Sequence, residues 1–314
     1  MRFLLLTFSL FVLFGASRAG AAGLALVLNS ADASLSVLDE VSGAEIRRIP
    51  VLREPHHFAL SPDGKELLAG DAGGNEMLFL SPTTGELLRR VPVADPYHLQ
   101  FSPNGKLLVV TGLARNQVDV YEAATMRLIK RFPASSMPSH ITFSPDSSMA
   151  FATLQGTNKL AAYDLVHLTP TWTSDVGRTP AGVLWHRDKL LVANMGTDSI
   201  VVVDPVDGRV ERHIRTGRGA HQIFLSPDGK RLWVNNRVDG TTVALDAATL
   251  EVIRTYKVPG GPDCIDFAPD GKLWITQRFI QKVGILDPAT GDLRSLSVGR
   301  SPHGIFLTDG VREH

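Results

Sequence analysis

Histidines recur where short apolar segments begin, and imidazole is a side chain that can bind metal ions or move protons. The stretch "EPHHFALSPDGK" at residues 54–65 places two histidines just before an apolar segment and a turn. Related stretches are "DPYHLQFSPNGK", "MPSHITFSPDSS", "GAHQIFLSPDGK", "GPDCIDFAPDGK" and "SPHGIFLTDG". The histidines therefore follow a repeated unit, and neutral rings gathered from several units would suit zinc or copper.

Two positions in each unit collect these side chains, and we name them by their distance from the following turn. The outer slots, five residues before the turn, hold His56, Tyr97, Ser139, Ala181, His221, Asp263 and His303. The inner slots, four residues before it, hold His57, His98, His140, Gly182, Gln222, Cys264 and Gly304. Six of the ten histidines in the chain occupy these slots, where a uniform distribution predicts about half of one.

This enrichment predicts a metal site at the mouth of a central channel. The candidate ligands are His57, His98 and His140, then His56 and His303, and more weakly His221, Asp263 and Cys264. Metal binding needs neutral imidazole, so the ordinary histidine pKa predicts that affinity falls as the pH drops through about 6.5. The alternative is that the repeat copied hydrogen-bonded structural histidines that bind nothing. The sequence leaves both interpretations open.

The spacing of the turns indicates which elements position these residues. The turns start at Ser61, Ser102, Ser144, His186, Ser226, Ala268 and Thr308, at intervals of 40–42 residues. That period is typical of four-stranded propeller blades. Within residues 179–216, three apolar segments and a more polar fourth alternate with turns rich in Gly, Pro and Asp. We therefore predict an all-β, seven-bladed β-propeller of four-stranded antiparallel blades.

The two ends of the chain complement each other. The last unit has only its first strand, "SPHGIFLTDG", and residues 24–51 read as the other three strands of such a unit. Pairing residues 304–307 with residues 24–28 would complete the last blade and remove exposed sheet edges. Residues 23–314 are therefore predicted to form a single propeller domain.

Residues 1–22 are predicted to be a cleaved signal peptide. Arg2 precedes an apolar run from Phe3 to Phe14, and Ala19 and Ala21 form an A-x-A pattern. The run is too short to span a bilayer, although an uncleaved anchor is the alternative. We expect a periplasmic or secreted monomer that does not associate with the membrane after cleavage.

Charge and cysteine content narrow the possible partners. The 32 basic residues equal the 32 acidic ones, and no run of like charge stands out. This pattern argues against binding to nucleic acid, which needs a basic surface. The single cysteine, Cys264, cannot form a disulfide within one chain.

Two resemblances to known families follow from these motifs. "LLVANMGTDSIVVVDPVDG" and "LDPATGDL" resemble the YVTN-type seven-bladed propeller repeat, a WD40-like repeat, over nearly all of residues 23–314. "DPYHLQFSPNGKLLVVTGLARNQVDVYE" resembles a unit of the cytochrome d1-like propellers of nitrite reductases. The second resemblance implies a haem d1-type tetrapyrrole facing His98 and His140. The general plan is also similar to exported propellers that chaperone zinc, and we favour zinc or copper over the tetrapyrrole.

The predicted function is binding of a metal ion or small cofactor at the histidine-lined mouth. The rival class is a scaffold that binds a periplasmic or envelope protein and no small ligand. A lactonase-like hydrolase is a further alternative, but the chain has no G-x-S-x-G, H-E-x-x-H or Walker motif. Asp63, Asp228 and Asp270 each lie in a "PDG" turn, which explains them without catalysis. Whether the protein is an enzyme stays open, and we favour a non-enzymatic role.

Overall fold

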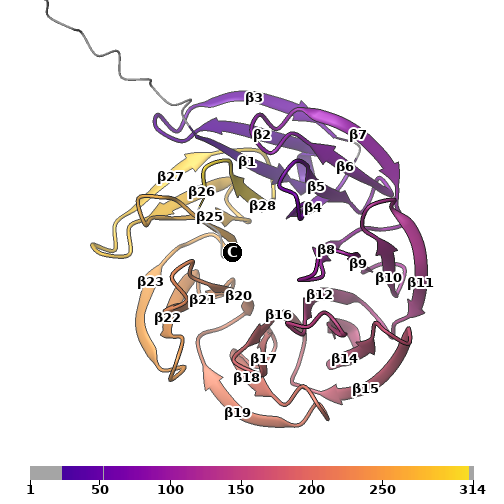
Figure 1. Cartoon of the computed structure of the whole chain (residues 1–314). Coiled ribbons are helices and arrows are strands. Elements are labelled where there is room, and N and C mark those ends of the chain that lie inside the picture. The colour runs from indigo at the N-terminus through magenta and orange to yellow at the C-terminus, as the bar shows by residue number, and fades with distance from the viewer. Residues whose placement is uncertain (1–22, 52, 311–314) are drawn as a thin grey trace, which may run out of the picture.

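Seven four-stranded sheets stand around a common axis in the computed structural model, which describes residues 23–51 and 53–310 (Figure 1). The predicted all-β, seven-bladed propeller is confirmed. Over these residues the helical segments are two 3-10 turns, η1 (Ser30–Asp32) and η2 (Gln155–Thr157). No helix within the described ranges is long and apolar enough to cross a membrane. The predicted signal peptide, residues 1–22, lies outside these ranges.

Each blade runs from an innermost strand at the axis to an outermost strand at the rim (Figure 1). The first four blades are β28 (Pro302–Leu307), β1 (Leu24–Asn29), β2 (Ser34–Asp39), β3 (Glu45–Pro50); β4 (Pro55–Leu60), β5 (Leu67–Asp71), β6 (Glu76–Leu80), β7 (Leu87–Pro92); β8 (His98–Phe101), β9 (Leu107–Gly112), β10 (Gln117–Glu122), β11 (Arg127–Pro133); and β12 (Pro138–Phe143), β13 (Met149–Leu154), β14 (Lys159–Asp164), β15 (Thr169–Asp175). The other three are β16 (Pro180–His186), β17 (Lys189–Asn194), β18 (Ser199–Val203), β19 (Val210–Arg215); β20 (Ala220–Leu225), β21 (Arg231–Asn236), β22 (Thr241–Asp246), β23 (Val252–Lys257); and β24 (Pro262–Phe267), β25 (Leu273–Gln277), β26 (Lys282–Leu286), β27 (Leu293–Ser297).

The hydrophobic core is a ring of clusters between neighbouring blades. Seven clusters of buried apolar side chains each join residues of two adjacent sheets. A middle strand is therefore covered on both faces, and β18 is buried along its whole length. Strands covered on both faces need continuous apolar runs instead of alternation. Outer strands such as β3 are mostly exposed, which explains their polar sequences.

The repeated Ser-Pro-Asp-Gly turns use their carboxylates for local structure. The Ser61 hydroxyl donates to Asp63 Oδ1 at 2.8 Å, and the Gly64 N–H donates to Ser61 O at 2.8 Å. Gly64 has φ +69°, a conformation that glycine adopts without strain. The Ser226 hydroxyl likewise donates to Asp228 Oδ1 at 2.6 Å. These contacts account for both aspartates as turn residues.

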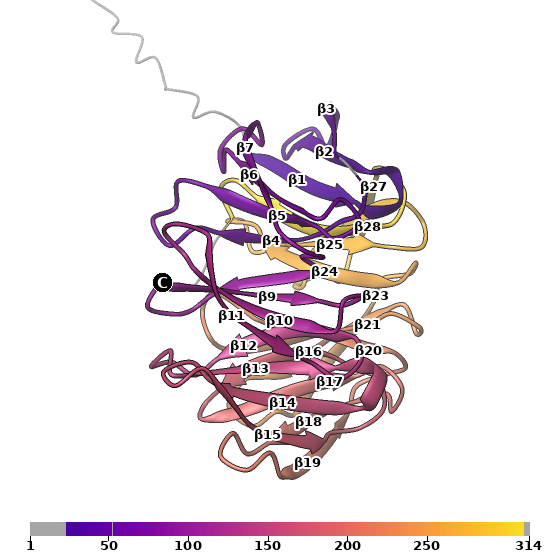
Figure 2. The ribbon, with the colours of Figure 1, turned by 90° about the vertical axis from the view of Figure 1, so that its right-hand side faces the viewer.

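The ring closes where the chain ends meet, as the sequence predicted. β28, in yellow, lies beside β1, in indigo (Figure 1, Figure 2). The two strands pair antiparallel, with Leu307 opposite Ala25 and Ile305 opposite Val27. The Thr308 N–H donates to Leu24 O at 2.8 Å, and the Leu24 N–H donates to Thr308 Oγ1 at 2.8 Å. The blade shared by the two ends therefore has the same four-stranded order as the other six.

Candidate functional site

In six of the seven blades, the pair of slots lies at an irregularity near the start of the innermost strand, and the β8 strand is the regular one. In β4, Pro55 pairs with Asp71 and Phe58 with Ala69, so His56 and His57 together oppose one residue. Similar register shifts occur in β12, β16, β20, β24 and β28. Neighbouring side chains of a regular strand point to opposite faces, and a bulge re-aims one of them. Both His56 and His57 consequently reach the ring of His303, with centroids 4.8 and 4.4 Å away.

Polar side chains of second strands hold these bulges in place. In four blades, a residue of the second strand that lies opposite the slots donates a hydrogen bond to the outer-slot carbonyl of the next blade. The pairs are Thr111 to Ser139 at 2.5 Å, Thr153 to Ala181 at 2.6 Å, Asn235 to Asp263 at 2.8 Å and Thr276 to His303 at 2.8 Å. These residues were not among the predicted site residues, although the recurrence of Thr or Asn near the end of the second strand is a visible signal in the sequence.

The histidine rings converge on the channel axis and pack against one another. The ring of His57 lies 4.4 Å from that of His303, 4.7 Å from His98 and 5.1 Å from His140, between centroids. His221 joins the cluster through His140, at 5.3 Å. We call these five rings the channel cluster. The predicted convergence is present, but the rings fill the channel entrance instead of lining an open mouth, because four of them are buried and His98 is partly buried.

The candidate ligands divide into two sets that share His57. One atom each from His57, His98 and His140 lie within 4.8 Å of one another. The same holds for His57, His303 and Cys264. Of the remaining candidates, His56 Nε2 lies 3.2 Å from Glu54 Oε1, and His221 Nδ1 lies 3.0 Å from Asp263 Oδ1.

Asp263 is a fully buried anion that two arginines neutralise. Its Oδ2 lies 2.6 Å from Arg237 Nη2 and 3.3 Å from Arg278 Nη1, and it is 3.6 Å from His303 Nε2. Burial opposes ionisation, but Arg237, His303 and His221 outweigh it and hold the pKa of Asp263 well below its usual range. The arginines come from turns after second strands, where the sequence analysis assigned no role.

Burial keeps the channel cluster neutral. It lowers the pKa of His98 to about 3, and burial with the charge of Arg237 lowers the pKa of His221 to about 4. Burial and repulsion from His303 and His98 lower the pKa of His57 well below its ordinary value. The pKa values of His140 and His303 are also well below their ordinary values, mainly through burial. Neutral imidazole is the form that ligates metals.

Several ring nitrogens in the cluster have no hydrogen-bond partner among residues 23–51 and 53–310. They include His57 Nε2, His98 Nδ1 and His140 Nε2. The other ring nitrogen of His140 is engaged, because Nδ1 lies 2.8 Å from Ser139 Oγ. His221 Nδ1, His221 Nε2 and His303 Nε2 also have no hydrogen-bond partner among these residues, although His221 Nδ1 and His303 Nε2 lie near Asp263. Buried polar atoms usually have partners, so a group of such atoms in one cluster requires an explanation.

Not every slot contributes a ligand. A Cβ added to Gly182 would lie 2.7 Å from the Cα of Gln222, and one added to Gly304 would lie 2.7 Å from His56 O. Glycine in these two inner slots therefore lets the next blade approach closely.

A hollow of about 450 Å³ borders the cluster on the face where the innermost strands begin. It is lined by Arg53, Glu54 and Arg278, together with Ser30, Ala31, Gly73 and Ser301. Glu54 contacts His56 and Arg278 contacts Asp263, so the hollow connects to the buried site through these two side chains.

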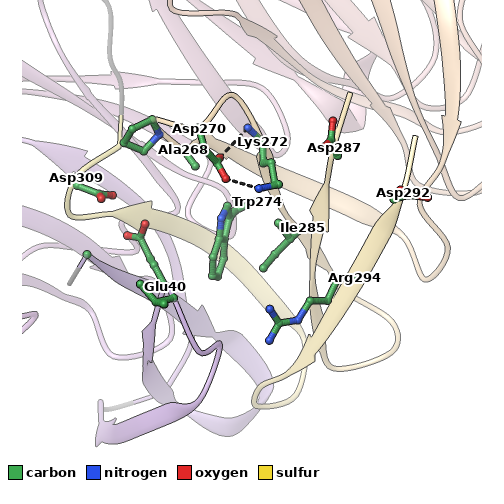
Figure 3. Close-up of a pocket in the computed structure, with 13 residues that line it drawn as sticks. Glu40, Ala268, Asp270, Lys272, Trp274, Ile285, Asp287, Asp292, Arg294 and Asp309 are labelled. Carbon is green, nitrogen blue, oxygen red and sulfur yellow. Dashed lines mark hydrogen bonds and ion pairs between the residues drawn. The ribbon is translucent and has the colours of Figure 1, made fainter. Parts of the chain in front are cut away.

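A second cavity, of about 570 Å³, lies at the opposite ends of the strands, beside the seam where the chain ends meet (Figure 3). Trp274 and Ile285 line it together with Glu40, Asp309 and Arg294. Burial, together with a hydrogen bond and the charge of Asp309, raises the pKa of Glu40 to about 8. Sequence analysis did not anticipate this cavity.

The Glu40 carboxyl should make the stability of the protein depend on pH. Its pKa is higher in the folded protein than the ordinary 4.5, so its stabilising effect is complete below about pH 4.5 and is lost as the pH rises through 8. We expect Glu40→Gln, which cannot ionise, to reduce the fall in melting temperature between pH 5 and pH 8.5. The exposed Glu251→Gln is the matched control. An equal fall in melting temperature between pH 5 and pH 8.5 for wild type and Glu40→Gln would contradict the raised pKa of Glu40.

Comparisons with known proteins agree with the fold. A family model described as YNCE-like β-propeller matches residues 13–312. Protein NirF of Pseudomonas aeruginosa is 27% identical over 157 residues, which make up 49% of this chain and 37% of NirF. The match therefore covers well under half of that relative's length.

Solved structures show the same architecture at low sequence identity. The dihydro-haem d1 dehydrogenase NirN, in complex with DHE, has a TM-score of 0.69 and 16% identity, covering 94% of this chain and 77% of NirN. The periplasmic gluconolactonase PpgL of Pseudomonas aeruginosa has a TM-score of 0.72 and 19% identity, covering 91% of this chain and 99% of PpgL. At these identities the likeness concerns the fold alone.

Proposed function

This chain belongs to the YNCE-like β-propeller family, and within that fold we propose that it is a binding protein whose channel histidines hold a zinc or copper ion. The fold does not specify the activity, since propellers host unrelated functions. The proposal therefore depends on the chemistry of the channel cluster.

The observation that carries it is the set of unpartnered nitrogens on His57, His98 and His140. Leaving a buried polar atom without a partner costs about 1–3 kcal/mol, and a bound ion would supply a partner to all three at once. Nitrogens around a tetrahedral zinc stand about 3.3 Å apart, given bonds of about 2.0–2.1 Å. One ring nitrogen from each of the three histidines lies within 4.8 Å of the others, so ring rotations would be needed to close the set around an ion.

The surroundings of His140 support a ligand role. Its Nδ1 lies 2.8 Å from Ser139 Oγ, and the Gln155 amide donates to that same oxygen at 2.6 Å. If Nδ1 carries the proton and donates to Ser139, the lone pair of Nε2 is free for a metal. Hydrogen bonds of this kind orient histidine ligands and fix their tautomer.

We expect His98→Ala to weaken zinc binding by at least about tenfold, because the variant loses one of three ligands. The measurement is a competition titration of purified, untagged protein with zinc, after the metal content of the isolated protein has been determined. His213→Ala is the matched control, because His213 is exposed on the outer strand β19. Equal zinc affinity in wild type and His98→Ala would overturn the proposal and favour a scaffold that binds a protein partner.

The structure changes the pH dependence that we expect for zinc affinity, and the same titration at pH 5 tests it. The ordinary histidine pKa predicts a loss of affinity near pH 6.5. Burial lowers the pKa of His98 to about 3, so its ring is already neutral at pH 5 in the folded protein. Affinity should therefore persist to a lower pH than the sequence suggested.

A d1-type tetrapyrrole is the second candidate, supported by the similarity to NirF and to the haem d1 dehydrogenase NirN. The residues fit such a group only in part. Arg53 and Arg278 in the hollow fit the carboxylates at its edge. The neighbouring His56 and His303 are buried, so the structure offers no exposed axial ligand there. A visible absorption band after addition of haem, shifted by His98→Ala, would favour this candidate.

Export to the periplasm or beyond also remains a proposal. It is supported by the leader-like composition of residues 1–22 and by the similarity to a periplasmic gluconolactonase. The N-terminal sequence of protein purified from the native host would show whether these residues are removed.

A further inference from the structure

Cys264 lies inside the channel cluster, next to two histidines. Its Sγ is 3.8 Å from His303 Nδ1 and 3.5 Å from Gln222 Oε1. His57, His303 and Cys264 are all buried, and one potential ligand atom from each lies within 4.8 Å of the others. His57 also has a buried Nε2 without a hydrogen-bond partner among the described residues. The thiol is thus part of a ready-made three-ligand arrangement.

We propose that His57, His303 and Cys264 form a copper(I) site, distinct in its ligands from the set made by His57, His98 and His140. This inference rests on the proposed metal-binding function and specifies the ion and its oxidation state. Thiolate is a soft ligand that selects copper(I) over hard cations, and imidazole also suits copper. The thiol occurs in this set and not in the all-histidine set, so selectivity for copper(I) should depend on Cys264.

The charged side chains next to the site favour a monovalent ion. Asp263 contributes one negative charge, and Arg237 and Arg278 contribute two positive charges within 3.3 Å of its carboxylate. Binding breaks the S–H bond of Cys264 and forms a Cu–S bond, and the thiol proton leaves to solvent. One proton is exchanged for one Cu⁺, so the local charge and the oxidation states do not change.

Zinc at the same place would add one positive charge to a buried region that already has an excess of one. Such charge is costly where water is excluded. Charge and the soft thiolate ligand therefore both favour copper(I) at this set.

The test is an anaerobic competition for copper(I) against bicinchoninate, with the full chain as wild type, Cys264→Ser and His98→Ala. We expect Cys264→Ser to lose at least about tenfold in copper(I) affinity while keeping wild-type zinc affinity. His98→Ala should show the reverse pattern. X-ray absorption at the copper edge should show one sulfur neighbour in wild type and none in Cys264→Ser.

Wild-type copper(I) affinity in a folded Cys264→Ser variant would overturn the proposal, even if zinc still binds through His98. Failure of the wild type to bind either ion would instead overturn the proposed function. Melting curves establish whether Cys264→Ser is folded. If it is not, His303→Gln removes a different ligand of the same set, and an unchanged copper(I) affinity there would be equally decisive.

Discussion

Replacing His57 with alanine should weaken the binding of both zinc and copper(I). His57 belongs to both candidate ligand sets and lies 4.4–5.1 Å, between ring centroids, from His303, His98 and His140. Each ion would lose one of three ligands, so we expect each affinity to fall by at least about tenfold. Parallel competition titrations with zinc and copper(I) measure both effects. His98→Ala and Cys264→Ser should each affect one ion, whereas His57→Ala should affect both.

The control for this experiment is His213→Ala, which removes an exposed imidazole. His57 is only 4% exposed, so truncating it leaves a cavity and will lower the melting temperature. His57→Gln keeps a polar side chain of intermediate size and separates loss of a ligand from loss of packing. Unchanged affinities in folded His57→Ala would show that the cluster is structural, and the scaffold interpretation would replace ours.

Deleting residues 301–314 should unfold the propeller. The deletion removes β28, whose Ile305, Phe306 and Leu307 are buried in the clusters on both sides of the shared blade. Burial of one such side chain contributes about 1.5–3 kcal/mol, and a folded domain is stable by only about 5–15 kcal/mol. The truncated chain would also expose the edge of β1. Thermal unfolding followed by circular dichroism should show the transition lost or strongly lowered.

Two further variants separate the effect of ring closure from the effect of removing residues. Removing residues 311–314 alone keeps all of β28, which ends at Leu307, so it should lower the melting temperature far less than the larger deletion. A circular permutant that joins residue 310 to residue 23 keeps the β28–β1 pair and should stay folded. If the 301–314 deletion melts like wild type, closure through β28 does not hold the ring together.

The amino-acid sequence by itself determined the architecture. Turn residues recur every 40–42 positions, and the apolar segments between them are short, so the strand count of each blade follows from local pattern. The incomplete units at the two ends, "SPHGIFLTDG" and residues 24–51, also predicted the shared blade. These features depend on turn chemistry and hydrophobic pattern within a few residues. The same periodicity identified the slots that supply His57, His98 and His140.

Only the tertiary structure decided what surrounds those histidines. Bulges bring adjacent residues such as His56 and His57 to the same side, although strand alternation alone would separate them. Arg237 and Arg278 reach Asp263 from turns on two different blades, and Cys264 meets His303 from 39 residues away. The depth of burial, which lowers the pKa of His98 to about 3, is likewise set by side chains from neighbouring blades. Convergence on a shared axis and loss of water depend on all seven blades together, so they could not be read from any one repeat.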